Sequence, residues 1–272
     1  MRRHAMLAAE RQGRIYDAVE ERTVVRVAEL AELLGVTPMT IRRDLDRLSS
    51  QGKLDKVHGG ATSTRARVHP STDEPGFQAK RLLQTAEKES IARAAVAMVR
   101  PGSTIGMSAG TTTWALARHL RAVAGLTVVT NSVRVADVLH EPRPDAPEVV
   151  LTGGERTVSD ALVGPLALSS LRRLHLDVVL LGVHGIHPAA GLTTPNAAEA
   201  QTDQALVDAA QRLVVVADHT KWGLLSAGSI APLSRVDVLV SDDRLADEAR
   251  ATLVRAGANV VLADGRPRAS AA

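Results

Sequence analysis

The sequence lacks cysteine and has few aromatic side chains, with two Trp, one Tyr and one Phe among 272 residues. Without cysteine the chain cannot form disulfides, thiolate zinc sites or a cysteine nucleophile. It also lacks an apolar run of the roughly 20 residues that a membrane-spanning helix needs. The N-terminus MRRHAMLAAERQG contains no apolar core of a signal peptide. With an apolar content of 45%, these absences favour a soluble cytoplasmic protein without a membrane partner.

The net charge of +3 is small but is unevenly distributed along the chain. Residues 1–70 carry 13 Lys or Arg against 9 Asp or Glu, whereas residues 71–272 carry 20 against 21. Many solvated helical faces carry a similar excess. Its confinement to the N-terminal quarter nevertheless suggests that this part alone meets a polyanion.

A segment with two prolines and a glycine divides the chain. It reads RARVHPSTDEPG over residues 65–76, a composition typical of a linker. Apolar spacing is mostly helical before this segment, and short Val, Leu and Ile runs alternate with amphipathic stretches after it. We predict a domain over 1–64, a linker over 65–78, a second domain over 79–265 and a disordered tail over 266–272.

The first domain has the pattern of a helix-turn-helix. Its apolar spacing predicts helices over residues 10–21, 27–34 and 38–50. Gly35 ends the second helix, because glycine readily adopts the left-handed conformation. Thr37 suits the N-cap of the third helix, and Pro38 suits its first position. Two short helices joined by a tight glycine turn form this motif.

The third helix directs its polar and basic side chains away from its apolar stripe. The predicted DNA contacts in this region are Thr37, Met39, Thr40, Arg42, Arg43 and Arg47. Arginine near the start of a recognition helix can pair with guanine O6 and N7 or hold a phosphate. The alternative is a solvated helix whose arginines pair with Asp44 and Asp46. The position within a helix-turn-helix favours DNA.

A β-hairpin follows the third helix, as in a winged helix. Residues 53–57 and 61–64 are strand-like, and two glycines between them suit the turn. Positive charge here suits contact with the DNA backbone or minor groove, although the histidine could be an ordinary turn residue. The predicted contacts in the wing are Lys53, Lys56, His58 and Gly59.

The second domain is predicted to be a mostly parallel α/β sheet. Its β-rich apolar runs lie at 104–107, 126–130, 148–151, 177–183, 213–217, 236–241 and 259–263. Helical patterns separate most of them, at 87–99, 113–121, 199–211 and 245–256. Strands without polar alternation are typically buried on both faces. Ligands of such sheets bind in the loops beyond the carboxyl ends of the strands.

The string VAELAELLGVTPMTIRRDLDRLSSQGKLDKVHGGAT resembles the DNA-binding head of DeoR-type bacterial transcriptional regulators, including their TIRRDL and HGGA signatures. The resemblance extends to about residue 245 through EKESIARAA, AGTTT, LTVVTNS, LTGGE, ALVGPLA, GLTTPNAAEA and DHTKWG. It implies a winged-helix head on a sensor domain with the fold of sugar-phosphate isomerases. It also implies a repressor of a carbohydrate-metabolism operon that a phosphorylated sugar releases from its operator.

The loop after the run at 104–107 has the features of a phosphate site. Its small residues let the backbone approach a phosphate, and the helix that follows supplies N–H donors. A capped turn has the same composition, but Gly110, Thr111 and Thr112 align with the effector-phosphate loop of the family. Ser108 stands where family members often carry Asp, so this chain loses a possible acceptor for sugar hydroxyls.

Two further loops offer polar groups or close backbone approach. Asn131 and Ser132 follow the next strand, where they could bond sugar hydroxyls or cap a helix. Gly153 and Gly154 follow another strand, where they could admit a ligand or form a plain turn. We include all four residues in the predicted effector site.

Glu199 and Lys221 complete the predicted effector site. Glu199, at the start of its helix, could accept sugar hydroxyls or simply favour the helix dipole. The segment Asp218-His219-Thr220-Lys221 resembles the Asp-x-Ser-Lys element of the isomerase fold. The resemblance implies that Lys221 supplies a point charge to a phosphate or a developing oxyanion.

We predict neither a metal nor a cofactor. His184 and His187 lie in a Gly/Pro loop with no clear third ligand. The alternative function is a sugar-phosphate isomerase-like enzyme that carries a DNA-binding head, with Glu199 as the available base. The region GVHGIHP lacks the acidic signature expected of that enzyme, so we predict a non-enzymatic regulator.

Specific binding by a winged helix also predicts self-association. One head buries little DNA surface, so a symmetric operator calls for two or more heads. The expected partners are a double-stranded operator, a phosphorylated sugar, and further copies of the chain in a homodimer or homotetramer.

Overall fold

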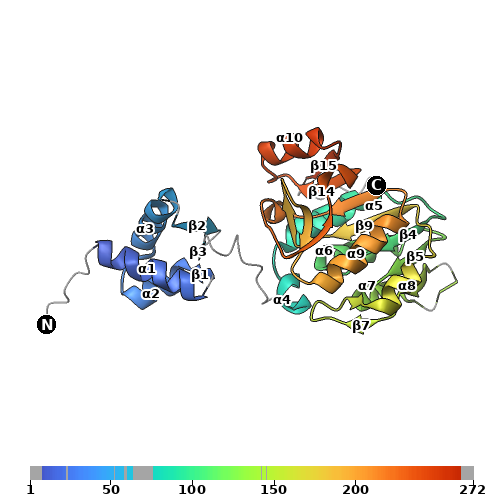
Figure 1. The fold of residues 1–272 in the computed structure, drawn as a ribbon, viewed down its shortest axis with the longest axis horizontal. Coiled ribbons are helices and arrows are strands. Elements are labelled where there is room, and N and C mark those ends of the chain that lie inside the picture. The colour runs from blue at the N-terminus through green and yellow to red at the C-terminus, as the bar shows by residue number, and fades with distance from the viewer. Residues whose placement is uncertain are drawn as a thin grey trace, which may run out of the picture. The chain divides into compact units, whose positions relative to one another are not determined.

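The computed structural model describes residues 8–22, 24–51, 53–57, 60–63, 76–141, 143–144 and 146–264. The chain divides into two compact units, Met1–Pro70 and Ser71–Ala272 (Figure 1). The predicted tail, residues 65–75 of the predicted linker, and the wing residues His58 and Gly59 lie outside the described residues. A search of the described helices finds none long and apolar enough to cross a membrane.

The first unit is a winged helix-turn-helix. Its elements are α1 (Ala8–Arg22), β1 (Val24–Arg26), α2 (Val27–Leu34), α3 (Pro38–Ser50), β2 (Leu54–Val57) and β3 (Gly60–Ser63). Gly35 has a φ of 64° after α2, and the Thr37 hydroxyl accepts a hydrogen bond from the N–H of Thr40 at 3.2 Å. These local signals explain why α2 and α3 begin and end where the sequence predicts.

The core of this unit joins all three helices to the small sheet. The strands are antiparallel in the order β1-β3-β2. Its least exposed large side chains are Ile15, Leu30, Ile41, Leu45 and Leu54, each at most 1% exposed. Because α3 buries its apolar stripe here, its opposite face is directed to solvent.

Asp44 of α3 is a buried charged residue held by α1. Its carboxylate accepts a hydrogen bond from Arg11 Nε at 2.6 Å and another from Gln12 Nε2 at 2.9 Å. A buried carboxylate needs such partners, because leaving it unpaired costs several kcal/mol. The pair therefore fixes the position of α3 against α1.

Replacement of Asp44 with alanine is expected to destabilise the first unit by about 3 kcal/mol, since Arg11 loses its buried partner. Thermal unfolding of the full chain, followed by circular dichroism, measures the effect. Asp46→Ala is the matched control on an exposed position of the same helix, where about 0.5 kcal/mol or less is expected. Equal destabilisation by both substitutions would contradict a special role for Asp44.

The second unit contains a seven-stranded parallel sheet in the order β15-β14-β12-β9-β4-β5-β6. The strands are β4 (Thr104–Met107), β5 (Thr127–Thr130), β6 (Glu148–Leu151), β9 (Val178–Gly182), β12 (Leu213–Val216), β14 (Val238–Asp242) and β15 (Asn259–Ala263). All seven match predicted runs to within two residues at each end. The predicted α/β class is confirmed.

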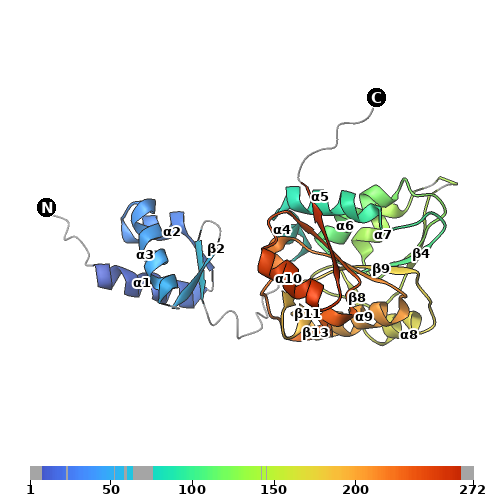
Figure 2. The ribbon, with the colours of Figure 1, turned by 90° about the horizontal axis from the view of Figure 1, so that it is seen from above.

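Helices cover both faces of this sheet (Figure 2). The face with α5 (Thr85–Val96), α6 (Thr111–Leu120) and α7 (Val133–Leu139) forms one core cluster. The other face packs against α8 (Pro165–Leu171), α9 (Ala197–Ala209) and α10 (Asp247–Arg255). The result is a three-layer α/β/α arrangement, which leaves the carboxyl ends of the strands free to form a site.

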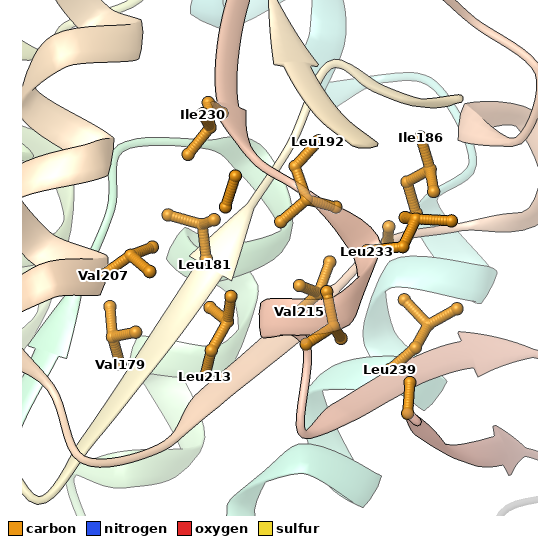
Figure 3. Packing of buried hydrophobic residues seen from close by; sticks show 14 of the residues in the cluster. Val179, Leu181, Ile186, Leu192, Val207, Leu213, Val215, Ile230, Leu233 and Leu239 are labelled. Atoms are coloured by element: carbon orange, nitrogen blue, oxygen red, sulfur yellow. The ribbon is translucent and has the colours of Figure 1, made fainter. Parts of the chain in front are cut away.

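A small antiparallel sheet lies against the α9 face and was not predicted. It contains β10 (Gly185–His187), β11 (Gly191–Thr194) and β13 (Gly228–Ala231). Ile186, Leu192 and Ile230 insert from these strands into the core beside Leu181 and Val215 of the large sheet (Figure 3). This packing positions the loops that follow β9 and β12. Two short strands, β7 (Glu155–Arg156) and β8 (Leu162–Val163), form a hairpin.

Two sequence predictions differ from the structure. The run at 148–151 was expected to be buried on both faces, but β6 is an edge strand in which Val150 and Leu151 are 39% and 46% exposed. The predicted linker extended to residue 78, but α4 (Phe77–Arg81) already begins at Phe77. Phe77 is buried and its ring meets the Trp114 ring edge-on, with centroids 6.0 Å apart.

Candidate functional site

The exposed face of α3 is the candidate DNA interface. Arg42, Arg43 and Arg47 are exposed along it, and Met39 is 56% exposed at its start. Thr40 is half-buried, with its hydroxyl 3.0 Å from that of Thr37. The alternative interpretation paired the arginines of this helix with Asp44 and Asp46. Asp44 instead pairs with Arg11 of α1.

The wing, which consists of β2 and β3, adds positively charged residues to the first unit. Lys53 is exposed immediately before β2, and Lys56 lies within that strand. Figure 1 shows β2 and β3 beside the three helices. Together, the wing and α3 supply arginine and lysine side chains suited to DNA phosphates and base edges.

The second candidate site lies where the chain reverses its path through the parallel sheet. Adjacent strands β4 and β9 continue to opposite edges of the sheet, because β4 leads to β5 whereas β9 leads to β12. Loops after such neighbouring strands separate and leave a crevice. A cavity of about 190 Å³ lies there. Its lining residues are Phe77, Lys80, Leu83, Gln84, Lys88, Ala109, Gly110, Thr111, Thr112, Ser159, Gly182, Val183, His184, Thr194, Glu199, Asp203, Asp218, Thr220 and Lys221.

The loop after β4 brings three predicted residues, Gly110, Thr111 and Thr112, to the cavity. Gly110 is the N-cap of α6. Its φ of 154° is a backbone conformation that residues other than glycine rarely adopt. The first turn of an α-helix has backbone N–H groups without partners inside the helix. The loop therefore presents N–H donors and hydroxyls to an anion in the cavity.

Three lysines surround the same cavity: Lys80 at the end of α4, Lys88 in α5, and Lys221 after β12. Lys88 is buried, and its ammonium donates hydrogen bonds to the carbonyls of Lys80 and Leu83 at 2.6 and 2.7 Å. Burial lowers the pKa of Lys88 to about 8 despite the nearby Asp218 carboxylate, and the Lys221 and Lys80 charges lower it further. Burial also lowers the pKa of Lys221. An anion would relieve this crowding of positive charge.

Lysine is rare in this chain, yet it is concentrated at the cavity. The sequence contains 28 arginines but five lysines. Three of the five line one cavity, and the other two, Lys53 and Lys56, belong to the wing. Lysine provides a compact charge that tolerates burial by giving up its proton, whereas arginine remains charged. Sequence analysis missed Lys80 and Lys88, although this scarcity of lysine was a usable signal.

Three carboxylates also line the cavity. Glu199 is buried near the start of α9 and accepts a hydrogen bond from the Thr157 hydroxyl at 2.5 Å. Asp203 lies one turn further along α9, and Asp218 caps the turn that carries Lys221. Asp218 accepts hydrogen bonds from the Thr220 N–H at 3.1 Å and from the Thr220 hydroxyl. Cations and acceptors thus share one cavity, as a ligand with an anionic group and hydroxyls requires.

Two predicted effector residues, Ser108 and Asn131, do not line the cavity. Both are fully buried. The Ser108 hydroxyl accepts a hydrogen bond from the Gly182 N–H at 2.9 Å, which joins the loops after β4 and β9. Asn131 Oδ1 accepts from the Ala109 N–H at 2.8 Å, while its Nδ2 has no hydrogen-bond partner. These side chains position the loops that form the cavity.

The other three predicted loop residues also lie away from the cavity lining. Ser132 is the N-cap of α7 and accepts a hydrogen bond from the Val135 N–H at 3.2 Å. Gly153 and Gly154 have positive φ values of 72° and 117°. A Cβ on Gly154 would lie 2.2 Å from the carbonyl oxygen of Val163. These glycines permit the tight packing of the chain between β6 and β7.

The two loop histidines lie in different surroundings. His187 Nδ1 accepts hydrogen bonds from the Ala189 and Ala190 N–H groups at 3.2 and 3.3 Å. His184 lines the cavity. No group of three or more potential metal ligands occurs among the described residues.

Comparison with known proteins agrees with this two-part architecture. Residues 11–67 match the DeoR-like helix-turn-helix domain, and residues 83–243 match the DeoR C terminal sensor domain. The chain is 36% identical over 257 residues to the HTH-type transcriptional regulator GlpR of Haloferax volcanii, covering 94% of this chain and 98% of that protein. It is 33% identical over 235 residues to the HTH-type transcriptional repressor CsqR of Escherichia coli K12, covering 86% and 87%.

A solved structure of ribose 5-phosphate isomerase A from Neisseria gonorrhoeae has a TM-score of 0.37 and 20% sequence identity. The alignment covers 51% of this chain and 53% of that chain.

A winged helix-turn-helix with a basic exposed recognition helix, joined to an α/β sensor domain, defines a DNA-binding transcriptional regulator. The chain belongs to the DeoR family of such regulators. The prediction of a regulator is confirmed, and the alternative of an enzyme is not supported, because the relatives are transcriptional regulators and repressors.

Proposed function

We propose that this regulator represses a carbohydrate-metabolism operon and that a phosphorylated sugar in the cavity controls its binding to DNA. The composition of the cavity is the observation that carries this proposal. Three lysines and the start of α6 suit a phosphate, while three carboxylates suit hydroxyl groups. A volume of about 190 Å³ fits a small polar molecule.

In the proposed site, Gly110, Thr111 and Thr112 bind the phosphate through backbone N–H groups and hydroxyls. Lys88 and Lys221 supply positive charge. Glu199 accepts hydrogen bonds from sugar hydroxyls, as proposed from the sequence. Ser108 and Asn131 act indirectly, because their hydrogen bonds hold the loops after β4 and β9. Ser132, Gly153 and Gly154 shape the surrounding backbone.

On DNA, we propose that α3 reads bases in the major groove and that the wing contacts the backbone or minor groove. Thr37, Thr40, Arg42, Arg43 and Arg47 meet the operator from α3 and its N-cap. Two or more heads in a homodimer or homotetramer bind a symmetric operator. An effector that changes the spacing of the heads weakens binding, and a coupling free energy of about 3 kcal/mol changes affinity over a hundredfold.

Calorimetric unfolding of the full chain tests effector binding. A panel of pentose and hexose monophosphates is compared with the unphosphorylated parent sugars. A ligand that binds the folded state raises its unfolding midpoint by mass action. We expect at least one monophosphate to raise the midpoint of the second unit while its parent sugar does not. A panel without any phosphate-dependent shift would contradict the proposed effector class.

The lowered pKa of Lys88 predicts that sugar-phosphate affinity falls as pH rises. Below pH 8 its ammonium is protonated before the anion arrives, whereas above pH 8 binding must also take up a proton. A phosphate monoester is already doubly charged above neutral pH, so its own ionisation does not oppose this trend. Between about pH 7.5 and 9.5 we expect roughly tenfold weaker binding by titration calorimetry. In Lys88→Arg, whose guanidinium stays charged, the dependence should be smaller. A flat wild-type profile would contradict the role of Lys88.

A further inference from the structure

The segment that continues from the DNA-binding unit into the sensor domain forms one wall of the cavity. Its first described element is the five-residue helix α4, which is separated from the end of β3 by the thirteen residues 64–76 of the sequence. Phe77 and Lys80 of α4 line the cavity, as do Leu83 and Gln84 beyond its end. A ligand in the cavity would therefore lie beside α4, the first described helix of the sensor domain after the DNA-binding unit.

The end of α4 depends on a cation that the ligand would share. The Lys88 ammonium donates to the carbonyls of Lys80 and Leu83, and an ammonium has three donors. Lys80 Nζ lies 3.3 Å from the Ser159 hydroxyl across the cavity wall. An anion that binds either ammonium would compete with, or reorient, the hydrogen bonds from that ammonium that hold the end of α4.

Both ends of α4 contact α6 through aromatic and cationic side chains. The Phe77 ring packs edge-on against Trp114. Arg81 of α4 and Arg118 of α6 each lie 5.5 Å from the centroid of the Trp114 ring. Trp114 donates its backbone N–H to the carbonyl of Gly110 at 3.0 Å. The tryptophan that contacts α4 therefore also belongs to the first turn of α6.

We propose that α4 transmits occupancy of the cavity to the DNA-binding unit, through Lys80 and Lys88 at its end and through Phe77 and Arg81 on Trp114. This inference rests on the proposed function, because it requires an anionic effector in the cavity. An anion that binds Lys80, Lys88 and the first turn of α6 changes both attachments of α4 together. The proposed result is a change in how the heads bind their operator.

The test measures DNA affinity and effector binding separately in the full-length chain. The DNA probe is a duplex selected from a random library by the wild-type protein. The effector probe is an equimolar mixture of pentose and hexose monophosphates, with the parent sugars at matched ionic strength as the blank. The variant Arg81→Ala weakens the attachment of α4 to Trp114 at an exposed position outside the cavity lining. Arg118→Ala is the matched control, because it removes the same kind of contact to Trp114 from α6 rather than α4.

In the wild type we expect the mixture to raise the Kd for DNA at least about tenfold. In Arg81→Ala this ratio should fall below about threefold, while the mixture still raises the unfolding midpoint as it does in the wild type. Arg118→Ala should keep the wild-type ratio. A wild-type ratio in Arg81→Ala, or equal losses in Arg81→Ala and Arg118→Ala, would overturn the role of α4 alone. Absence of any midpoint shift in the wild type would instead overturn the proposed effector, and the inference with it.

Discussion

Replacing Arg42 with alanine is expected to weaken binding to the selected operator duplex by about 1–3 kcal/mol, or roughly 5- to 150-fold. Arg42 is exposed near the N-terminus of α3, where recognition helices contact base edges. A guanidinium that pairs with guanine loses two hydrogen bonds on truncation. Fluorescence anisotropy with labelled duplex at fixed salt concentration measures the change.

The matched control for Arg42→Ala is Arg172→Ala, the same substitution at an exposed position after α8 of the sensor domain. It should leave the Kd for the operator unchanged. A duplex of scrambled sequence separates the two roles of Arg42, because loss of a base contact reduces the preference for the operator whereas loss of a phosphate contact weakens both complexes. Wild-type affinity and preference in Arg42→Ala would exclude Arg42 from the interface.

Replacing Lys221 with alanine is expected to weaken the response to phosphorylated sugars strongly while operator binding stays normal. Lys221 lines the cavity beside Asp218, far along the sequence from the DNA-binding unit. Loss of a charged hydrogen bond to phosphate typically costs about 1.5–3 kcal/mol, so sugar-phosphate affinity should fall roughly 10- to 150-fold. Titration calorimetry and operator anisotropy measure the two properties independently.

Lys53→Ala provides the opposite profile for comparison. Lys53 is exposed at the wing, so its loss should weaken operator binding and reduce the salt dependence by about one phosphate contact. Its response to sugar phosphates should remain that of the wild type. If Lys221→Ala responds normally to effector, the assignment of the cavity as the effector site is wrong.

The architecture could be predicted from sequence because its local signals agree with its packing. The boundaries of α2 and α3 match the prediction at both ends, since Gly35, Thr37 and Pro38 end one helix and begin the next. The apolar runs of the large sheet were equally clear. The small sheet was missed because β10, β11 and β13 read GIH, GLTT and GSIA, without a run of apolar residues, and are stabilised by packing on the core.

The cavity was predicted in part, because sequence indicates loops but not which side chains face inward. Gly110, Thr111, Thr112, Glu199 and Lys221 come together in it. The other five predicted residues lie outside its lining. A serine, asparagine or glycine that stabilises a loop cannot be distinguished in the sequence from one that binds a ligand.

Lys80 and Lys88 were missed for a different reason. Lys80 follows the predicted linker, and Lys88 lies on a helix where a lone lysine usually faces solvent. Their inward placement results from packing of α4 and α5 around the cavity, which juxtaposes residues that no local pattern connects.

The dependence of operator affinity on phosphorylated sugars tests the central claim most directly. Full-length protein is titrated into the labelled operator duplex with each pentose or hexose monophosphate in turn, and with each parent sugar at equal ionic strength. A two-part regulator of the proposed kind should show at least one monophosphate that raises the Kd by about tenfold or more, equivalent to about 1.4 kcal/mol. Its parent sugar should have no effect. Unchanged operator affinity across all the monophosphates would contradict control by a phosphorylated sugar.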